Sequence, residues 1–217
     1  MGSTWEEKFK TNLLEVLYRP DQPRVPAGVP EGGQFASDGG GSGFLSDEGE
    51  TRVRAVEDGI VGSPVEIGVA FDKDGNELFR VQGTEDSVSF SPDQVRMMVG
   101  QVLTHNHPTG SSFSPSDVLV AQQAGLKEIR AVGKDYVYKI SGPGGRWKQE
   151  YTSQSTGTTA SLATHIENIA GRVYDELVAT VYAGAMSASE ANSVHHHTLW
   201  TRVSEDIGLQ YGRTARN

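Results

Sequence analysis

The chain has 217 residues, no cysteine and a formal net charge of −9 at pH 7. Without cysteine there can be no disulfide, no thiolate zinc ligand and no cysteine nucleophile, so a metal would have to be held by histidine, aspartate or glutamate. The acidic balance disfavours a general nucleic-acid binder. The sequence contains no run approaching the ~20 apolar residues of a membrane span and no signal peptide, so we expect a soluble protein.

Residues 1–61 are predicted to form a short helix followed by a flexible tether. The apolar spacing over residues 1–18 is compatible with an amphipathic helix. The stretch from Pro20 to Gly43 is rich in glycine and proline, which disfavour regular structure, and Phe35 is its one candidate anchor.

Residues 62–141 are predicted to form a mixed α/β domain, a sheet flanked by helices. Val65, Ile67, Val69 and Phe71 alternate with polar or small residues that include Glu66, which predicts a strand. Further strands are expected at 78–82, 87–90, 101–105, 129–132 and 136–140. Helices are expected after Ser91 and over residues 115–124, because a serine followed by proline is a typical helix start.

Residues 142–217 are predicted to form a linker and an antiparallel helical pair. Apolar residues step by three or four from Leu162 to Val181, and a second such run extends from Val194 to Ile207. The segment starting at Ser187 would cap the second helix, and the pair is expected to pack either on the sheet or on a partner chain.

The most informative segment for chemistry is Thr104-His-Asn-His-Pro108. If the preceding apolar run ends as a strand, its period of two directs the imidazoles of His105 and His107 to the same side. Two imidazoles and a carboxylate from Asp117 would supply three nitrogen and oxygen ligands and leave a fourth position for water. This is the arrangement of a catalytic zinc site.

Ser114-Pro-Ser-Asp117 has two interpretations. It is a capping box that would be expected at a helix start whether or not a metal is bound. It also places Asp117 near the positive end of the helix dipole, and the glycine-containing turn from Pro108 to Phe113 can fold it back toward the histidines.

Together these residues resemble a known family. Glu66, then His105-x-His107-Pro108, then Ser114-x-x-Asp117 is similar to the signature of the JAMM (MPN-plus) zinc metallopeptidases, and the wording His-Asn-His-Pro is similar to RadC-type members. The resemblance covers about residues 62–141. It implies a JAMM/MPN-like core of the cytidine-deaminase-like type.

The resemblance also implies a role for each residue of the signature. It implies Zn²⁺ held by His105, His107 and Asp117, with Ser114 helping to hold the tetrahedral intermediate and Glu66 as general base. A carboxylate beside a zinc-bound water can move its proton to a leaving amine, and Glu66 lies on a strand expected in the same sheet as the histidines. A solvent-facing position for Glu66 is the alternative, and Glu77 and Glu85 are less well placed competitors.

One departure from the family pattern concerns the loop between the second histidine and the aspartate. Nine residues separate His107 from Asp117, one fewer than is usual. Either the loop is tighter, or Ser116 and Asp117 shift and the metal site is weakened or lost.

Other motifs have less specific interpretations. His195-His196-His197 cannot converge on one ion from a helix, because consecutive side chains fan about 100° apart, so exposed helix positions are expected. Trp147, Trp200 and Tyr211 form either a stacking surface or ordinary packing. The segments 26–35 and 199–211 resemble parts of phage capsid-associated proteins at low specificity, with a linker and an amphipathic helix as the alternative.

The function expected from these features is zinc-dependent hydrolysis of a peptide or isopeptide bond. The expected partners are a protein or peptide substrate and a phage or bacterial protein. Neither a membrane nor a nucleic acid is expected as a partner. The setting would be bacterial cytoplasm or a virion. The main alternative is a non-catalytic scaffold or binding module of the same fold, and a RadC-like role near DNA is disfavoured by the acidic charge.

Overall fold

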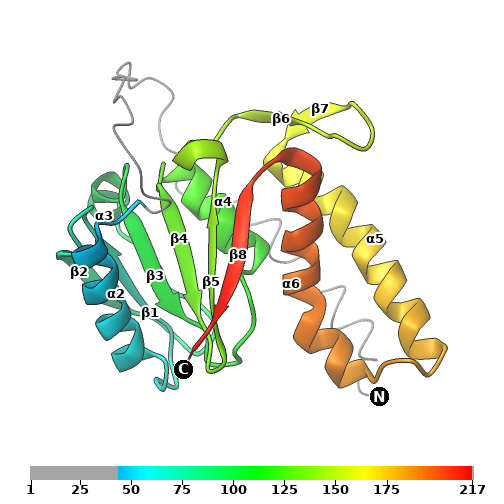
Figure 1. The fold of residues 1–217 in the computed structure, drawn as a ribbon, viewed down its shortest axis with the longest axis horizontal. Helices are drawn as coiled ribbons and strands as arrows, with labels where there is room; N and C mark the ends of the chain where they lie inside the picture. The colour runs from blue at the N-terminus through cyan, green and yellow to red at the C-terminus, as the bar shows by residue number, and fades with distance from the viewer. Residues whose placement is uncertain (1–43, 217) are drawn as a thin grey trace.

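A computed structural model of the chain describes residues 44–216. The helix expected at 1–18, the proline-rich tether and the segment 26–35 therefore lie outside the described residues. The described part is an α/β fold with one mixed six-stranded sheet, as the sequence predicts (Figure 1). Its strand order is β2-β1-β3-β4-β5-β8, and β3 and β4 form the parallel pair while the other neighbours are antiparallel.

The sheet is built mainly from the strands that the alternating pattern predicts. These are β1 (Ile67–Phe71), β2 (Glu77–Gln82), β3 (Val102–Asn106), β4 (Glu128–Val132), β5 (Tyr136–Ser141) and β8 (Gln210–Ala215). A two-stranded sheet, β6 (Glu150–Thr152) with β7 (Thr159–Ser161), lies beside the helical pair, and a 3-10 turn spans Pro143–Gly145.

Five helices are described, and each begins after a serine whose side chain accepts a hydrogen bond from the first turn. Such a cap pairs an N–H that the helix itself leaves without a partner. The helices are α2 (Asp47–Ile60), α3 (Pro92–Met97), α4 (Pro115–Gln123), α5 (Leu162–Tyr182) and α6 (Ala188–Ile207).

Helices cover both faces of the sheet, so the fold has three layers (Figure 1). Val53 of α2 packs with Val69 and Val102 on one face. The opposite face, which includes Leu103, packs against α4, α5 and α6. Because neighbouring residues of a strand point to opposite faces, β3 contributes Val102 to one core and Leu103 to the other.

Besides the small β6–β7 sheet, which forms where a linker was expected, other features differ from the sequence-based expectation. Residues 87–90 form no strand, because the backbone there closes a turn in which the Thr84 amide donates to the Ser87 carbonyl. Residues 47–60 form the helix α2 rather than part of a tether. Finally, β8 pairs with β5, so residues outside 62–141 complete the sheet.

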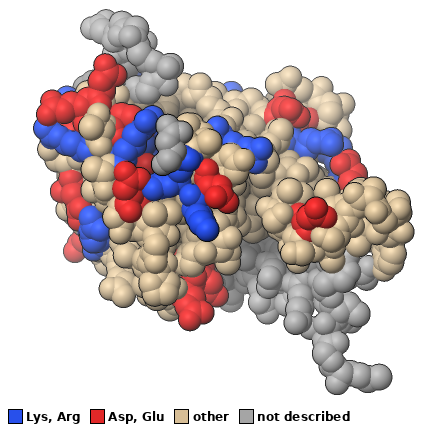
Figure 2. Space-filling model, turned by 60° about the horizontal axis from the view of Figure 1, so that its bottom comes forward, with Lys and Arg blue, Asp and Glu red and all other residues tan. Residues whose placement is uncertain are grey.

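The surface charges are mixed in sign on the face shown in Figure 2, where basic side chains lie among acidic ones. Among the described residues, no helix is long and apolar enough to span a bilayer. The helical pair predicted at the C-terminal end is present as α5 and α6, which pack against each other.

Candidate metal centre

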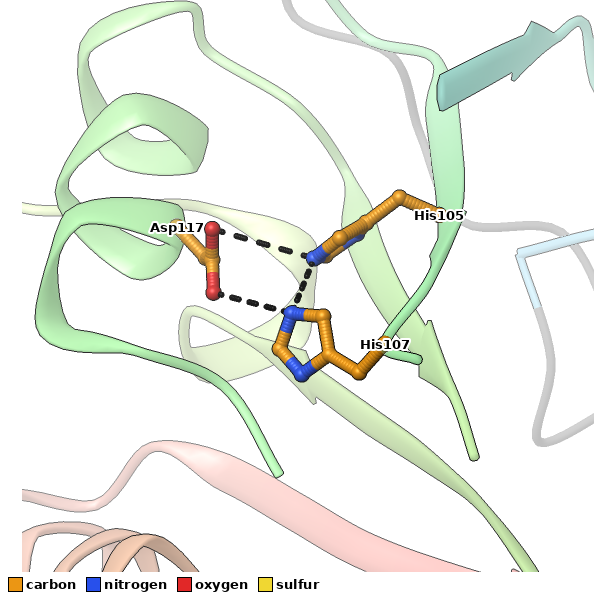
Figure 3. Close-up of side chains that lie close together, drawn as sticks. All are labelled: His105, His107 and Asp117. Atoms are coloured by element: carbon orange, nitrogen blue, oxygen red, sulfur yellow. Dashed lines mark hydrogen bonds and ion pairs between the residues drawn. The ribbon is translucent and has the colours of Figure 1, made fainter. Parts of the chain in front are cut away.

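The two histidines of the His-x-His motif point to one place at the end of β3, as predicted (Figure 3). His105 is on the strand and His107 follows it, and their Nε2 atoms are 2.9 Å apart. Both side chains are buried. The main chain holds His107 in place, because its amide donates to the Val132 carbonyl of the neighbouring strand.

Asp117 approaches the same place from the first turn of α4 (Figure 3). Its Oδ1 is 3.7 Å from Nε2 of His105, and its Oδ2 is 3.5 Å from Nε2 of His107. The side chain is 21% exposed, the most open of the three. The nine-residue loop therefore brings Asp117 to the histidines rather than displacing it.

A turn at Gly110 reverses the chain within the loop between His107 and Asp117. Gly110 has φ +76°, a conformation that only glycine adopts at little cost, and its amide donates to the His107 carbonyl. The chain then reverses toward Ser114, whose capping box with Asp117 is complete. The Ser114 hydroxyl also donates to Oδ2 of Asp117 over 2.8 Å. The capping box is therefore compatible with a position of Asp117 beside the two histidines.

The hydrogen bonds of His107 determine which of its nitrogens faces the site. Its Nδ1 lies 2.9 Å from the Ser111 carbonyl, which can only accept, so Nδ1 carries the proton. In the neutral ring Nε2 is then a lone-pair nitrogen directed toward Asp117 and His105. By contrast, Nδ1 of His105 is buried without a hydrogen-bond partner among the described residues.

The charges of the cluster shift the pKa values of its members. Burial alone would raise the pKa of Asp117, but His105 and His107 outweigh it and hold this pKa well below its usual range. Burial alone would lower the pKa of His107, but the hydrogen bond and charge of Asp117, with Glu66 and Ser111, raise it. Two imidazoles and a carboxylate at this spacing are stabilised by positive charge, supplied by a proton or a metal ion.

The cluster fits a metal ion by geometry and by chemistry. One ligand atom from each of His105, His107 and Asp117 lies within 4.8 Å of the other two. Ligands of a tetrahedral zinc ion are about 3.4 Å apart, because zinc binds nitrogen and oxygen at about 2.0–2.2 Å. The two Nε2 atoms are 2.9 Å apart, and each lies 3.5–3.7 Å from a different oxygen of the Asp117 carboxylate, so the separations lie on either side of that value.

Glu66 lies beside this cluster, immediately before β1. Its Oε1 is 3.7 Å from Nε2 of His107, and the residue is only 7% exposed. The alternative of a solvent-facing position is therefore wrong, because the side chain is buried beside the cluster. Burial raises the pKa of Glu66, although His105 and His107 partly oppose it.

The competing carboxylates have other surroundings. Glu77 is exposed on β2 and pairs with Arg80, and Glu85 is exposed in the turn after β2. Ser114 contacts Asp117 and Ser116, so the contacts present assign it the role of holding Asp117. Its predicted contact with an intermediate stays a prediction.

The exposed positions expected for the histidine triplet are wrong. His195 is 5% exposed, and His196 and His197 are half-buried. The reason is that α6 packs on the loop before α4, where Trp200 donates to the Phe113 carbonyl over 2.7 Å. Trp200 is fully buried, so packing rather than a stacking surface explains it.

Two residues from the C-terminal part of the chain contact the loop at Ser112, and the sequence does not reveal either contact. His196 hydrogen-bonds the Ser112 backbone, and burial lowers its pKa to about 4. Tyr211 of β8 shares a hydrogen bond of 2.8 Å with the Ser112 hydroxyl. Segments about 90 residues downstream thus hold the loop that joins the two histidines to Asp117.

Comparison with known proteins adds no family to this description. No family model, curated protein or solved structure matches the chain.

Proposed function

We propose that this protein is a zinc-dependent hydrolase that cleaves a peptide or isopeptide bond. The observation that carries the proposal is the convergence of His105, His107 and Asp117 at one buried point, with Glu66 beside them. Two neutral imidazoles and one carboxylate are the donor set of a catalytic zinc site, whereas structural zinc sites use four protein ligands. The resemblance to the JAMM signature supports the same chemistry.

The proposed reaction needs a metal-activated water and a group that moves its proton. A bound zinc ion supplies Lewis acidity, which polarises a carbonyl and lowers the pKa of a coordinated water to about 7. Glu66 would accept a proton from this water and deliver it to the leaving amine. Its raised pKa makes the carboxylate a stronger base, which favours the first of these steps.

Ser114 and Ser111 would keep the ligands in place. The Ser114 hydroxyl holds Oδ2 of Asp117, and the Ser111 carbonyl fixes the tautomer of His107. Such partners orient the ligands, and their loss typically costs 10–100-fold in metal affinity.

The setting and the partners stay part of the proposal. A protein or peptide substrate follows from the proposed reaction, and a phage or bacterial partner follows only from the resemblance of segments 26–35 and 199–211. A cytoplasmic or virion-associated location rests on the same resemblance. The mixed charges on the face in Figure 2 and the net charge of −9 support a role without nucleic acid.

The substitution Glu66→Gln tests the proposal. We expect the full chain loaded with zinc to cleave members of a fluorescence-quenched peptide set that includes lysine-linked isopeptides. Glu66→Gln should lower kcat by about 100- to 10,000-fold, the usual contribution of a general acid and base, without loss of zinc. Turnover and zinc content by elemental analysis are the measurements.

Glu85→Gln is the matched control, because Glu85 is an exposed acid close in sequence to the same strands. It should keep both zinc and turnover. A zinc-loaded wild-type protein that cleaves none of the probes would favour the non-catalytic module. Full turnover by Glu66→Gln would remove Glu66 from its role.

A further inference from the structure

Asn106, the residue between the two histidines, is completely buried on the face of β3 opposite to His105. Its side chain therefore does not point at the metal cluster. It points instead at the segment that leads into β1, where it makes three hydrogen bonds with main-chain groups.

These hydrogen bonds enclose Glu66 on both sides. Oδ1 of Asn106 accepts from the Ile67 amide over 2.8 Å. Its Nδ2 donates to the Val65 carbonyl over 3.1 Å and to the Ser63 carbonyl over 3.4 Å. The peptide groups immediately before and after Glu66 are thus both bound to one side chain.

The main chain of Glu66 itself is held from the other direction. Its amide donates to the Thr84 carbonyl over 2.7 Å, and its carbonyl accepts from the Gly83 amide over 2.8 Å. Glu66 lies just outside β1, where the β1–β3 ladder begins at Gly68 opposite His105. Asn106 is therefore the direct link between the backbone of Glu66 and the histidine strand.

We propose that Asn106 is a positioning residue that fixes the Glu66 backbone to the histidine strand and so sets the Glu66 carboxylate at the metal site. The inference rests on the proposed function, in which Glu66 moves the proton. A displacement of about 1 Å in a catalytic group can cost about 100-fold in rate. Removing the Asn106 amide should therefore lower kcat while the metal ligands, on the other face of the strand, stay in place.

The test compares two substitutions of Asn106 in the full-length protein. Asn106→Leu removes all three hydrogen bonds at similar size, and Asn106→Asp keeps an acceptor for the Ile67 amide but loses both donated bonds. We expect Asn106→Leu to lower kcat about 100-fold, with KM changed less than about threefold and zinc content unchanged. Asn106→Asp should fall between Asn106→Leu and the wild type, and it serves alone if Asn106→Leu does not fold.

Thr104→Val is the matched control. Thr104 lies two residues earlier on the same face, is equally buried, and hydrogen-bonds Glu57 of α2 over 3.0 Å rather than the Glu66 segment. This variant should lose stability yet keep kcat within about twofold. An equal fall in kcat in Thr104→Val would overturn the proposal, because the effect would then be one of general destabilisation.

Hydrogen exchange of the Ile67 amide supplies a readout that is independent of turnover. It should accelerate at least about 10-fold in Asn106→Leu, which removes the acceptor, accelerate less in Asn106→Asp, which keeps one, and stay protected in Thr104→Val. Unchanged exchange in Asn106→Leu, or unchanged kcat or loss of zinc in either Asn106 variant, would overturn the proposal. If exchange accelerates but the zinc-loaded wild type cleaves none of the probes, the hydrolase function fails while the link between Asn106 and the Glu66 backbone stands.

Discussion

At the scale of single residues, the site depends on hydrogen bonds that do two jobs. The Ser114 hydroxyl accepts from the Asp117 amide, which caps α4, and donates to the Asp117 carboxylate, which orients a metal ligand. The same hydroxyl therefore belongs both to the cap of α4 and to the candidate metal centre. The consequence is that stability and metal affinity should respond together to a change at Ser114.

The substitution Ser114→Ala separates these two jobs when it is compared with Ser91→Ala. We expect Ser114→Ala to cost about 1 kcal/mol of stability, as lost caps do, and to weaken zinc binding about 10- to 100-fold. Unfolding in urea and zinc titration are the measurements.

Ser91 offers the matched control because it begins α3 with a similar serine-proline capping box, whose side-chain hydrogen bonds are with Gln94 rather than with a candidate metal ligand. Ser91→Ala should cost similar stability and leave zinc affinity unchanged. Equal zinc affinities in both variants would mean that Ser114 is a helix cap only.

The residues that could be predicted from the sequence are those whose spacing is local. The period of two in β3 places His105 and His107 together, and the capping box places Asp117 at a helix start. Asn106 could not be assigned a role, because its partners lie 39 to 43 residues earlier in the chain. The burial of Glu66 depends on the layer that covers its face, which strand periodicity alone does not reveal.

At the scale of elements, α2 is held to the sheet by charge as well as by apolar packing. Arg130 of β4 is 2% exposed and pairs with Glu50 and Glu128 at 2.6 Å each. Lys139 of β5 also pairs with Glu50, at 2.9 Å. The first turn of α2 carries three acidic residues, Asp47, Glu48 and Glu50. Such a helix is hard to recognise from its sequence as one that packs on the sheet, because the cations that pair with Glu50 lie on distant strands.

This network predicts a dependence of stability on pH. Burial alone would raise the pKa of Glu50, but the hydrogen bonds and charges of Arg130 and Lys139 outweigh it and lower it from 4.5 to about 2. A carboxyl group with a depressed pKa stabilises the fold fully above its unfolded value. That stabilisation is lost as the pH falls from about 4.5 through 2.

We therefore expect Glu50→Gln to cost about 1–2 kcal/mol at pH 7, after discounting for the part of the side chain that solvent screens. The difference from the wild type should shrink at pH 3, as measured by urea unfolding at both pH values. Glu48→Gln is the control, because Glu48 is 76% exposed and pairs only with Arg52 among the described residues. A Glu50→Gln difference that is the same at both pH values would contradict the assignment.

At the scale of the whole molecule, the C-terminal part contributes a strand and two helices to the same sheet and core as the metal cluster. The strand β8 closes the sheet beside β5, and α6 holds the loop that leads to Asp117 through Trp200. The helical pair itself could be predicted from its apolar spacing. Its docking on the sheet could not be distinguished from docking on a partner chain, because periodicity identifies an apolar face but not the surface that covers it.

The central claim is that the described fold brings three separate residues together to hold a metal ion. The measurement that tests it most directly is the zinc content of the full chain after incubation with zinc and removal of the unbound ion. We expect roughly one zinc ion per chain for the wild type, as for a single three-ligand site, and a large loss in Asp117→Asn and His107→Ala. A folded wild-type protein that retains no zinc, or variants that retain as much as the wild type, would contradict the account.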